Sequence, residues 1–309
     1  MEQNRSSGVL EFVLICFPGI EHWQHWLSIP IVLFFLLVVA TNATLIATIY
    51  SSPSLHQPLY YLLFMLALVD LVKNFTLLPK SLAILWFNEN RIIPFTCFSQ
   101  VFILGFCTGM EASVFTGLAY DRYIAICHPL HHSSIITNRK FAEAASVSLI
   151  VNAVIFLPFP LLSTRQHYCG DTIKHCFCEN LPLAKLACDS SRANYIYSLV
   201  ILSAYMMVLS LSLTFSYGMI LRAVLRLSTS RASKKAFHTC SSHLILICIN
   251  YVILILNSIS NRMEDFIPRY IHVLLSIFKV LAQSFFNPFV YGIKTKEIRQ
   301  EIKRLFRWM

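Results

Sequence analysis

Uncharged apolar segments of about 20 residues or more recur along this chain, and this feature constrains its fold most strongly. Roughly 20 helical residues cross a bilayer core of about 30 Å, so each segment is long enough to span a membrane. The chain is 56% hydrophobic and 13% charged, whereas soluble proteins are about 25% charged. We therefore predict an all-α membrane protein, a bundle of seven transmembrane helices. The predicted spans are residues 27–50, 58–80, 95–127, 141–161, 193–221, 236–260 and 270–292.

The distribution of Lys and Arg predicts how the bundle is oriented. Alternate loops and the C-terminal tail are rich in both, and short loops of this kind stay in the cytosol, which places the N-terminus outside. The net charge of +10 then faces anionic membrane lipid and cytosolic partners, not nucleic acid. We predict a single domain over 1–309, with an extracellular N-terminus at 1–26 and a long second extracellular loop at 162–192. Asn4 begins a glycosylation sequon on the outer side.

The C-terminal segment 293–309 has the pattern of a short amphipathic helix. Its apolar residues recur at helical spacing, while basic residues occupy the other positions. This pattern predicts a cytosolic helix that lies on the inner leaflet. The apolar positions are Ile298, Ile302, Leu305 and Phe306.

Half of the ten cysteines lie on the predicted outer side, where the environment is oxidising. Five cysteines allow two disulfides and one free thiol, and their spacing alone does not choose the pairing. These five are Cys97, Cys169, Cys176, Cys178 and Cys188. We interpret the other five as packing residues or free thiols: Cys16, Cys107, Cys127, Cys240 and Cys248.

Several polar residues interrupt the predicted spans, where a charge is costly. Asp70, Glu111 and Asn287 supply oxygen atoms that suit a hard cation, so one hypothesis is a bound sodium ion that biases two packings of the bundle. The alternative is a static hydrogen-bond network that makes the helices more rigid. Both interpretations stay open at this point. Lys73 and Lys279 are further charges within spans, each of which can snorkel or pair with a neighbouring acid.

A charged pair, Asp121 and Arg122, ends the third span at the predicted cytosolic side. Arg cannot be deprotonated in a protein and must find a partner, so a second partner that competes for Arg122 turns the pair into a two-state device. In the last span, Pro288 follows Asn287 and removes a backbone hydrogen bond, which creates a hinge.

Together these motifs resemble those of the rhodopsin-like G-protein-coupled receptors, and more narrowly the odorant receptors. The resemblance covers nearly the whole chain. It rests on Leu55-His56-Gln57-Pro58-Leu59-Tyr60-Tyr61, Ala119-Tyr120-Asp121-Arg122-Tyr123-Ile124-Ala125-Ile126-Cys127, Ser216-Tyr217, Lys235-Ala236-Phe237-His238-Thr239-Cys240-Ser241-Ser242-His243-Leu244 and Asn287-Pro288-Phe289-Val290-Tyr291-Gly292. The class I, fish-like branch is indicated by Phe17-Pro18-Gly19-Ile20-Glu21, Met110-Glu111-Ala112-Ser113 and Lys294-Thr295-Lys296-Glu297-Ile298-Arg299.

The resemblance implies a ligand pocket in the outer half of the bundle, beneath the long loop. In the family pattern, Arg262 and Ser258 engage a ligand carboxylate. Because Arg262 is followed by Glu264 and Asp265, a loop salt bridge is the alternative role. The pocket residues implied are Leu104, Gly105, Thr108, Tyr251, Ile255, Ser258 and Arg262.

Two positions depart from the class I pattern. Gly105 stands where this branch usually carries His, which removes a polar contact and adds room, and Ile253 stands where many relatives carry Pro. The family pattern also implies two disulfides, Cys97–Cys178 and Cys169–Cys188, and leaves Cys176 unpaired.

The resemblance further implies a small volatile odorant as ligand, with carboxylic acids among the ligands of the branch. It implies a stimulatory, olfactory-type G protein that raises cyclic AMP, and a multi-pass receptor in the plasma membrane, ciliary in sensory neurons. The switch residues implied are Asp121, Arg122, Tyr123, Tyr217, Asn287, Pro288 and Tyr291.

The sequence carries no phosphate-binding Gly-rich loop, zinc-spaced His pair or nucleophile elbow, so we predict no enzymatic activity. The alternatives are a receptor of the same fold for a non-odorant metabolite, and a transporter or channel. A transporter predicts internal symmetry, and none is visible in the sequence.

Overall fold

The computed structural model describes residues 10–188, 192–225, 248–250, 252–253, 255–256, 259–260 and 266–308. Within these residues, six helical segments are long and apolar enough to cross a membrane. They are α1 (Gln24–Ser51), α2 (Pro58–Phe87), α3 (Pro94–Cys127), α5 (Asn138–Phe156) continued by α6 (Pro158–Thr164), α8 (Arg192–Leu225) and α10 (Arg269–Lys294). Each corresponds to one predicted span. The remaining predicted span, 236–260, lies largely outside the described residues.

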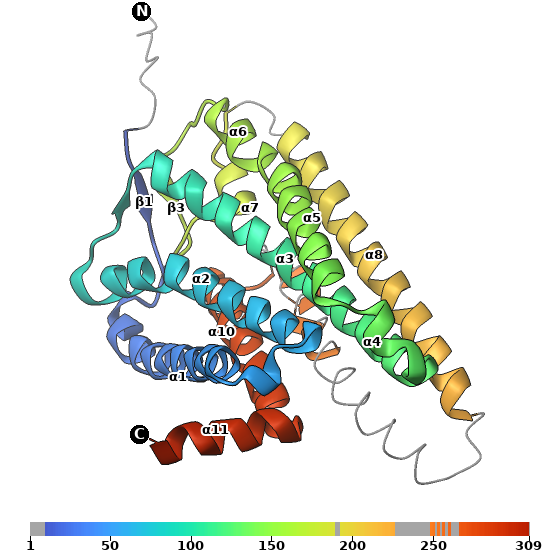
Figure 1. Cartoon of the computed structure of the whole chain (residues 1–309). Coiled ribbons are helices and arrows are strands. Elements are labelled where there is room, and N and C mark those ends of the chain that lie inside the picture. The colour runs from blue at the N-terminus through green and yellow to red at the C-terminus, as the bar shows by residue number, and fades with distance from the viewer. Residues whose placement is uncertain are drawn as a thin grey trace, which may run out of the picture.

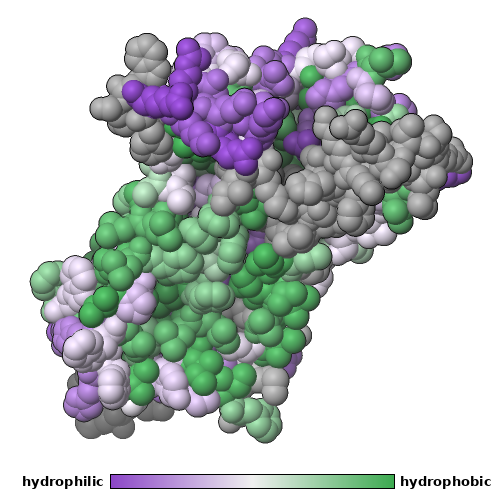
Figure 2. Space-filling view, turned by 90° about the horizontal axis from the view of Figure 1, so that it is seen from below, coloured by the Kyte–Doolittle hydropathy of each residue, from purple (hydrophilic) through white to green (hydrophobic). Residues whose placement is uncertain are grey.

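The helices form a bundle in which α3 lies at the centre. It contacts α2 on one side and α5, α6 and α8 on the other, and α1, α2 and α10 pack together (Figure 1). Many apolar side chains on the outside of the bundle are exposed, which suits contact with lipid. Figure 2 shows them as a broad green area, with the most hydrophilic side chains gathered apart from it.

Helix boundaries follow local chemistry. Pro58 and Pro94 each stand at the start of their helices, where the missing N–H group has no intrahelical partner to lose. Helix α2 runs beyond the predicted end at residue 80, because Pro79 lies inside the helix without ending it. It stops at Phe87, where Asn88 takes a left-handed conformation at φ 57° and its N–H bonds back to the carbonyls of Ala83 and Ile84.

A small three-stranded sheet covers the outer end of the bundle. Strand β1 (Phe12–Leu14) lies between β2 (Arg91–Ile92), to which it is antiparallel, and β3 (Thr172–Ile173), to which it is parallel. Phe12 and Leu14 point into the core, whereas Val13 between them is partly exposed. The N-terminal segment is thus built into the outer face together with the long second loop, an arrangement that the sequence pattern does not predict.

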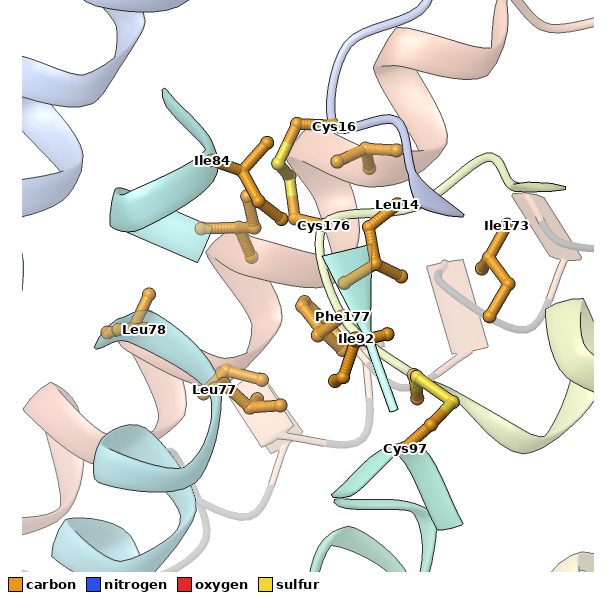
Figure 3. Close-up of a cluster of buried hydrophobic side chains, with 14 of the residues drawn as sticks. Leu14, Cys16, Leu77, Leu78, Ile84, Ile92, Cys97, Ile173, Cys176 and Phe177 are labelled. Atoms are coloured by element: carbon orange, nitrogen blue, oxygen red, sulfur yellow. A yellow bond between two sulfur atoms is a disulfide. The ribbon is translucent and has the colours of Figure 1, made fainter. Parts of the chain in front are cut away.

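Three disulfides hold this outer face together. The structure joins Cys97 to Cys178 and Cys169 to Cys188, the two pairings that the resemblance implies. It also joins Cys16 to Cys176, so the predictions of a free or packing Cys16 and an unpaired Cys176 are wrong. Figure 3 shows this third disulfide within an apolar cluster that includes Leu14 from β1 and Ile84 from α2.

On the opposite side of the bundle, α11 (Lys296–Trp308) is the helix predicted for the C-terminal segment. It runs across the end of α10 and α1 (Figure 1). Ile298 is fully buried among apolar residues of α1 and α2, with Ile302 packed beside it. The Oγ of Ser52, at the end of α1, donates a hydrogen bond of 2.9 Å to Glu301 Oε2. The apolar face of α11 is therefore turned partly toward the bundle.

Candidate functional site

A cavity of about 620 Å³ lies in the outer half of the bundle. This volume is in the range of sites for small organic ligands. Its walls come from α3, the α5–α6 junction, α8 and α10, and residues 179–185 of the long loop close it from outside. Helix α7 (Asn180–Ala184) carries part of that loop.

Aromatic side chains form one wall of the cavity. Phe156 stacks on Phe159, with ring centroids 5.8 Å apart, and also contacts Tyr205 at 5.6 Å. A Cβ atom at Gly105 would lie 2.4 Å from Phe156 Cδ1, closer than any side chain tolerates. Because Gly105 has no side chain, the Phe156 ring can pack directly against its backbone. The space expected at Gly105 from the sequence is therefore occupied by Phe156.

Charged side chains also line the cavity, and their net charge is positive. Lys279, within α10, makes no hydrogen bond or ion pair with any residue that the structure describes. Lys185 and Glu179 line the outer part, and Lys73 from α2 lines the inner part. Because the ammonium group of Lys73 is paired with Glu111, Lys279 is the cation that faces the cavity from a membrane-spanning helix without a counter-ion in the described structure.

Below the cavity lies a buried polar core that joins α2, α3 and α10. The ammonium group of Lys73 donates to Glu111 Oε1 and lies 3.3 Å from Gln283 Oε1. The amide of Gln283 in turn donates to Glu111 Oε2 at 2.8 Å. Lys73 and Glu111 are 3% and 2% exposed, so the pair is shielded from solvent. The pairing resolves the role of Lys73 that the sequence left open.

The second carboxylate of this core, Asp70, is held by hydrogen bonds from α10. Ser284 Oγ donates to Asp70 Oδ1 at 2.9 Å, and Asn287 Nδ2 donates to Asp70 Oδ2 at 2.8 Å. The amide of Asn74 donates to Ser284 Oγ at 2.7 Å, and the amide of Asn42 donates to the Ser284 carbonyl at 2.9 Å. All five side chains are buried. Ser284 thus joins α1, α2 and α10 through one network.

At the cytosolic end of α3, Asp121 has two partners. Arg122 Nε lies 3.8 Å from Asp121 Oδ2, and His132 Nε2 lies 3.1 Å from Asp121 Oδ1. His132 comes from α4 (His132–Ile135), in the loop that follows α3. Tyr123 and Tyr217 pack against Ile220 of α8 beside this pair. Asp121 is buried, whereas His132 is partly exposed.

Comparison with known proteins identifies the family. The family model described as olfactory receptor matches residues 31–308. Human olfactory receptor 56A5 is 45% identical over 98% of this chain and 97% of its own length. Human olfactory receptors 56A1 and 52K1 are 44% and 38% identical, over 97% and 96% of this chain and 94% and 95% of their own lengths. This chain belongs to the olfactory receptor family.

Members of this family are receptors and not enzymes, and the chain is a multi-pass membrane protein. Of the pocket residues implied by the resemblance, the structure places Leu104, Gly105 and Thr108 in the cavity wall. Ile255 is 42% exposed and does not line this cavity. Tyr251, Ser258 and Arg262 lie outside the described residues, as does Asn4.

The residues that the resemblance implies as switch residues are divided between two places in this olfactory receptor. Asp121, Arg122, Tyr123 and Tyr217 lie together at the cytosolic end, whereas Asn287 belongs to the polar core next to Asp70. Pro288 follows it within α10, and the side chain of Tyr291 lies outside the described part.

Sequence reasoning missed three features of this receptor: the aromatic wall, the position of Lys279 in the cavity and the second partner of Asp121. A signal for Lys279 was present, because a lysine in an apolar span is costly and marks a functional position. His132 and Phe156 carried no such signal, since a loop histidine and a phenylalanine in a span are both ordinary.

The second loop also carries a buried histidine, His175, next to the disulfide-bonded Cys176. Its ring lies 4.3 Å from that of Phe177 in an edge-on arrangement. Burial lowers the pKa of His175 below its usual value of 6.5; Glu179 opposes this shift, and Lys279 and His272 add smaller effects in the same direction as burial. In the same loop, burial raises the pKa of Tyr168 to about 12, and its hydroxyl donates to the Ser163 carbonyl at 2.8 Å.

Proposed function

We propose that this receptor binds a small volatile ligand with a carboxylic acid or a similar polar group in the outer cavity. We further propose that binding activates a stimulatory, olfactory-type G protein and raises cyclic AMP. The observation that carries the ligand class is Lys279, a cation without a partner in the described structure that lines a largely apolar cavity. Lys279 is partly buried, and water screens a partly buried cation less than an exposed one, so it attracts an anion more strongly.

The shape and chemistry of the cavity suit a small amphiphilic molecule. Phe156, Phe159 and Leu104 supply apolar surface for a hydrocarbon chain, and Lys279 supplies charge for its polar end. The resemblance assigns the carboxylate to Arg262 and Ser258 instead. The two anchors predict different variants to be sensitive, so experiment distinguishes them.

The cytosolic end supports coupling to a G protein. Arg122 is held at 3.8 Å from Asp121, a separation longer than that of a strong ion pair, and His132 also engages Asp121. When Arg122 moves away from Asp121 toward a bound G protein, His132 can remain as the partner of Asp121. Such a pair can be biased by a ligand that favours one packing of the helices. We place the receptor in the plasma membrane, and in cilia when a sensory neuron expresses it.

The test is a cyclic AMP assay in cells that co-express the receptor with an olfactory-type stimulatory G protein. The ligand panel consists of matched pairs, in which each straight-chain carboxylic acid is compared with the alcohol of the same length. Surface staining confirms that each variant reaches the membrane, and Arg122→Ala controls for coupling. We expect acids to be more potent than their alcohols.

Two variants then locate the anchor. Lys279→Met should lower the potency of acids by about tenfold or more and leave the potency of alcohols within a few-fold, because a charged hydrogen bond contributes roughly 1.5–3 kcal/mol. Arg262→Ala reports on the anchor that the family pattern implies, and Lys80→Met, on α2 and outside the cavity lining, is the matched control. Silence of a surface-expressed receptor toward the whole panel would argue against the odorant function, whereas a response to alcohols alone would refute the acid class.

A further inference from the structure

Lys73 places a covalently attached cation inside the polar core. It lies one helical turn after Asp70 on α2, so both side chains face α3 and α10. Its ammonium group donates to Glu111 of α3 and lies 3.3 Å from Gln283 Oε1 of α10. One positive charge thus connects three helices at a point shielded from water.

The same contacts already use the carboxylate oxygens that would have to bind a free cation at the predicted sodium site. Both oxygens of Glu111 already accept hydrogen bonds, one from Lys73 and one from Gln283. Both oxygens of Asp70 also accept hydrogen bonds, from Ser284 and Asn287. An ion held by Asn287 would need its amide oxygen, but the structure turns the NH₂ group of that amide toward Asp70. The residues therefore do not fit the proposed sodium ligand set.

Lys73 also reduces the negative charge that would attract a sodium ion. Asp70 and Glu111 carry two negative charges when ionised, and Lys73 neutralises one of them. Within the polar core, the buried oxygens that lack a partner in the described structure are the neutral amide oxygens of Asn42, Asn74 and Asn287. Neutral amide oxygens suit ordered water, which supplies the donors that they need.

We propose that Lys73 is the resident cation of this receptor's polar core and takes the place of a diffusible sodium ion. The inference does not depend on the ligand or on the proposed signalling pathway. Because Lys73 also lines the inner end of the cavity, the same cation connects the ligand site with the network around Glu111. The stability of the receptor should then be insensitive to the concentration of sodium.

The experiment measures thermal unfolding of the purified full-length receptor in detergent, in sodium chloride and in choline chloride at equal ionic strength. For the wild-type receptor we expect the same midpoint in both salts. Lys73→Met leaves Glu111 without a counter-ion, so its midpoint should fall, and it should recover by a few degrees in sodium but not in choline. Lys73→Met combined with Glu111→Gln should regain most of the lost stability and respond equally to both salts.

Two controls keep the result interpretable. Lys73→Arg retains a cation and should stay insensitive to sodium, and Lys80→Met removes a lysine of α2 that lies away from the core. If Lys73→Met yields no folded protein, recovery of folding by the added Glu111→Gln change supports the pairing, and failure to recover overturns it. A saturable increase in the wild-type midpoint that is specific to sodium would also overturn the proposal.

Discussion

The disulfide between Cys16 and Cys176 gives a prediction whose size follows from the structure. It joins the N-terminal segment to the second extracellular loop, across 160 residues of sequence. Because Cys97–Cys178 already joins the loop to α3, the new bond closes an effective loop of only about 80 residues. A loop of this length costs the unfolded chain roughly 4.5 kcal/mol of conformational entropy.

The expected effect is smaller than this figure. Membrane-spanning segments keep their helical backbone hydrogen bonds when the bundle loosens, so the unfolded state has fewer conformations for a disulfide to remove. We therefore expect Cys16→Ser to lower the free energy of unfolding by about 2–4 kcal/mol. At about 2 °C per kcal/mol for a chain of this size, the midpoint should fall by roughly 4–8 °C.

Thermal unfolding followed by tryptophan fluorescence measures this change. Trp86 is a suitable reporter because it lies near the outer face, where its indole N–H donates to Ser28 Oγ at 2.8 Å. Cys16→Ser, Cys176→Ser and the double variant should all lose the same stability, since each removes one and the same bond. Cys248→Ser, which changes an exposed free cysteine, is the matched control.

Additive losses in the double variant would refute this reasoning, because they would mean that the two sulfurs contribute separately. A midpoint of Cys16→Ser equal to that of the wild-type receptor would refute it as well. A reducing agent should lower the wild-type midpoint at least as far as Cys16→Ser does, since it removes this disulfide together with the other two.

Two further predictions concern close packing and pH. Gly109→Ala should destabilise the receptor by about 1–3 kcal/mol, because the new Cβ would lie 2.1 Å from Asn152 Oδ1. The control Gly218→Ala has open space around the new Cβ and should cost less than about 1 kcal/mol. Equal midpoints of thermal unfolding for the two variants would contradict this prediction. Burial lowers the pKa of His175 in the folded state, so the unfolded chain binds more protons and stability should fall as pH drops below about 6.5 toward that lowered pKa. His175→Phe should reduce this dependence of the unfolding free energy on pH. An unchanged dependence below pH 6.5 would contradict the assignment of this effect to His175.

The spans could be predicted from the sequence because hydropathy and length decide them locally. A membrane helix satisfies its own backbone hydrogen bonds, so an apolar segment of sufficient length needs no distant partner to become helical. The ends were harder to place, as α2 shows: Pro79 and Lys80 look like a boundary, yet the helix continues to Phe87. A membrane helix tolerates an internal proline when its surroundings satisfy the freed backbone groups, and a sequence pattern does not report those surroundings.

The outer sheet could not be predicted, because each of its strands has only two or three residues. Strand β1 becomes a strand only by pairing with segments roughly 80 and 160 residues away. For the same reason the sequence indicated a packing residue at Cys16, which lies in the apolar run Ile15-Cys16-Phe17. Its disulfide partner is chosen by the sheet, which holds the backbone of residue 15 against Ile173 at 2.9 Å.

The polar core shows the same division between local and distant information. The positions of Asp70, Lys73 and Glu111 inside spans indicated that each needs a polar partner, since each charge is costly in a membrane. Their spacing placed Asp70 and Lys73 on one face of α2, but it did not reveal which of the two would face Glu111. The observed pairing of Lys73 with Glu111 leaves Asp70 to α10. Helix α10 therefore contacts the polar core at two separate points, with Gln283 next to Lys73 and Glu111 and with Asn287 next to Asp70, directly before Pro288.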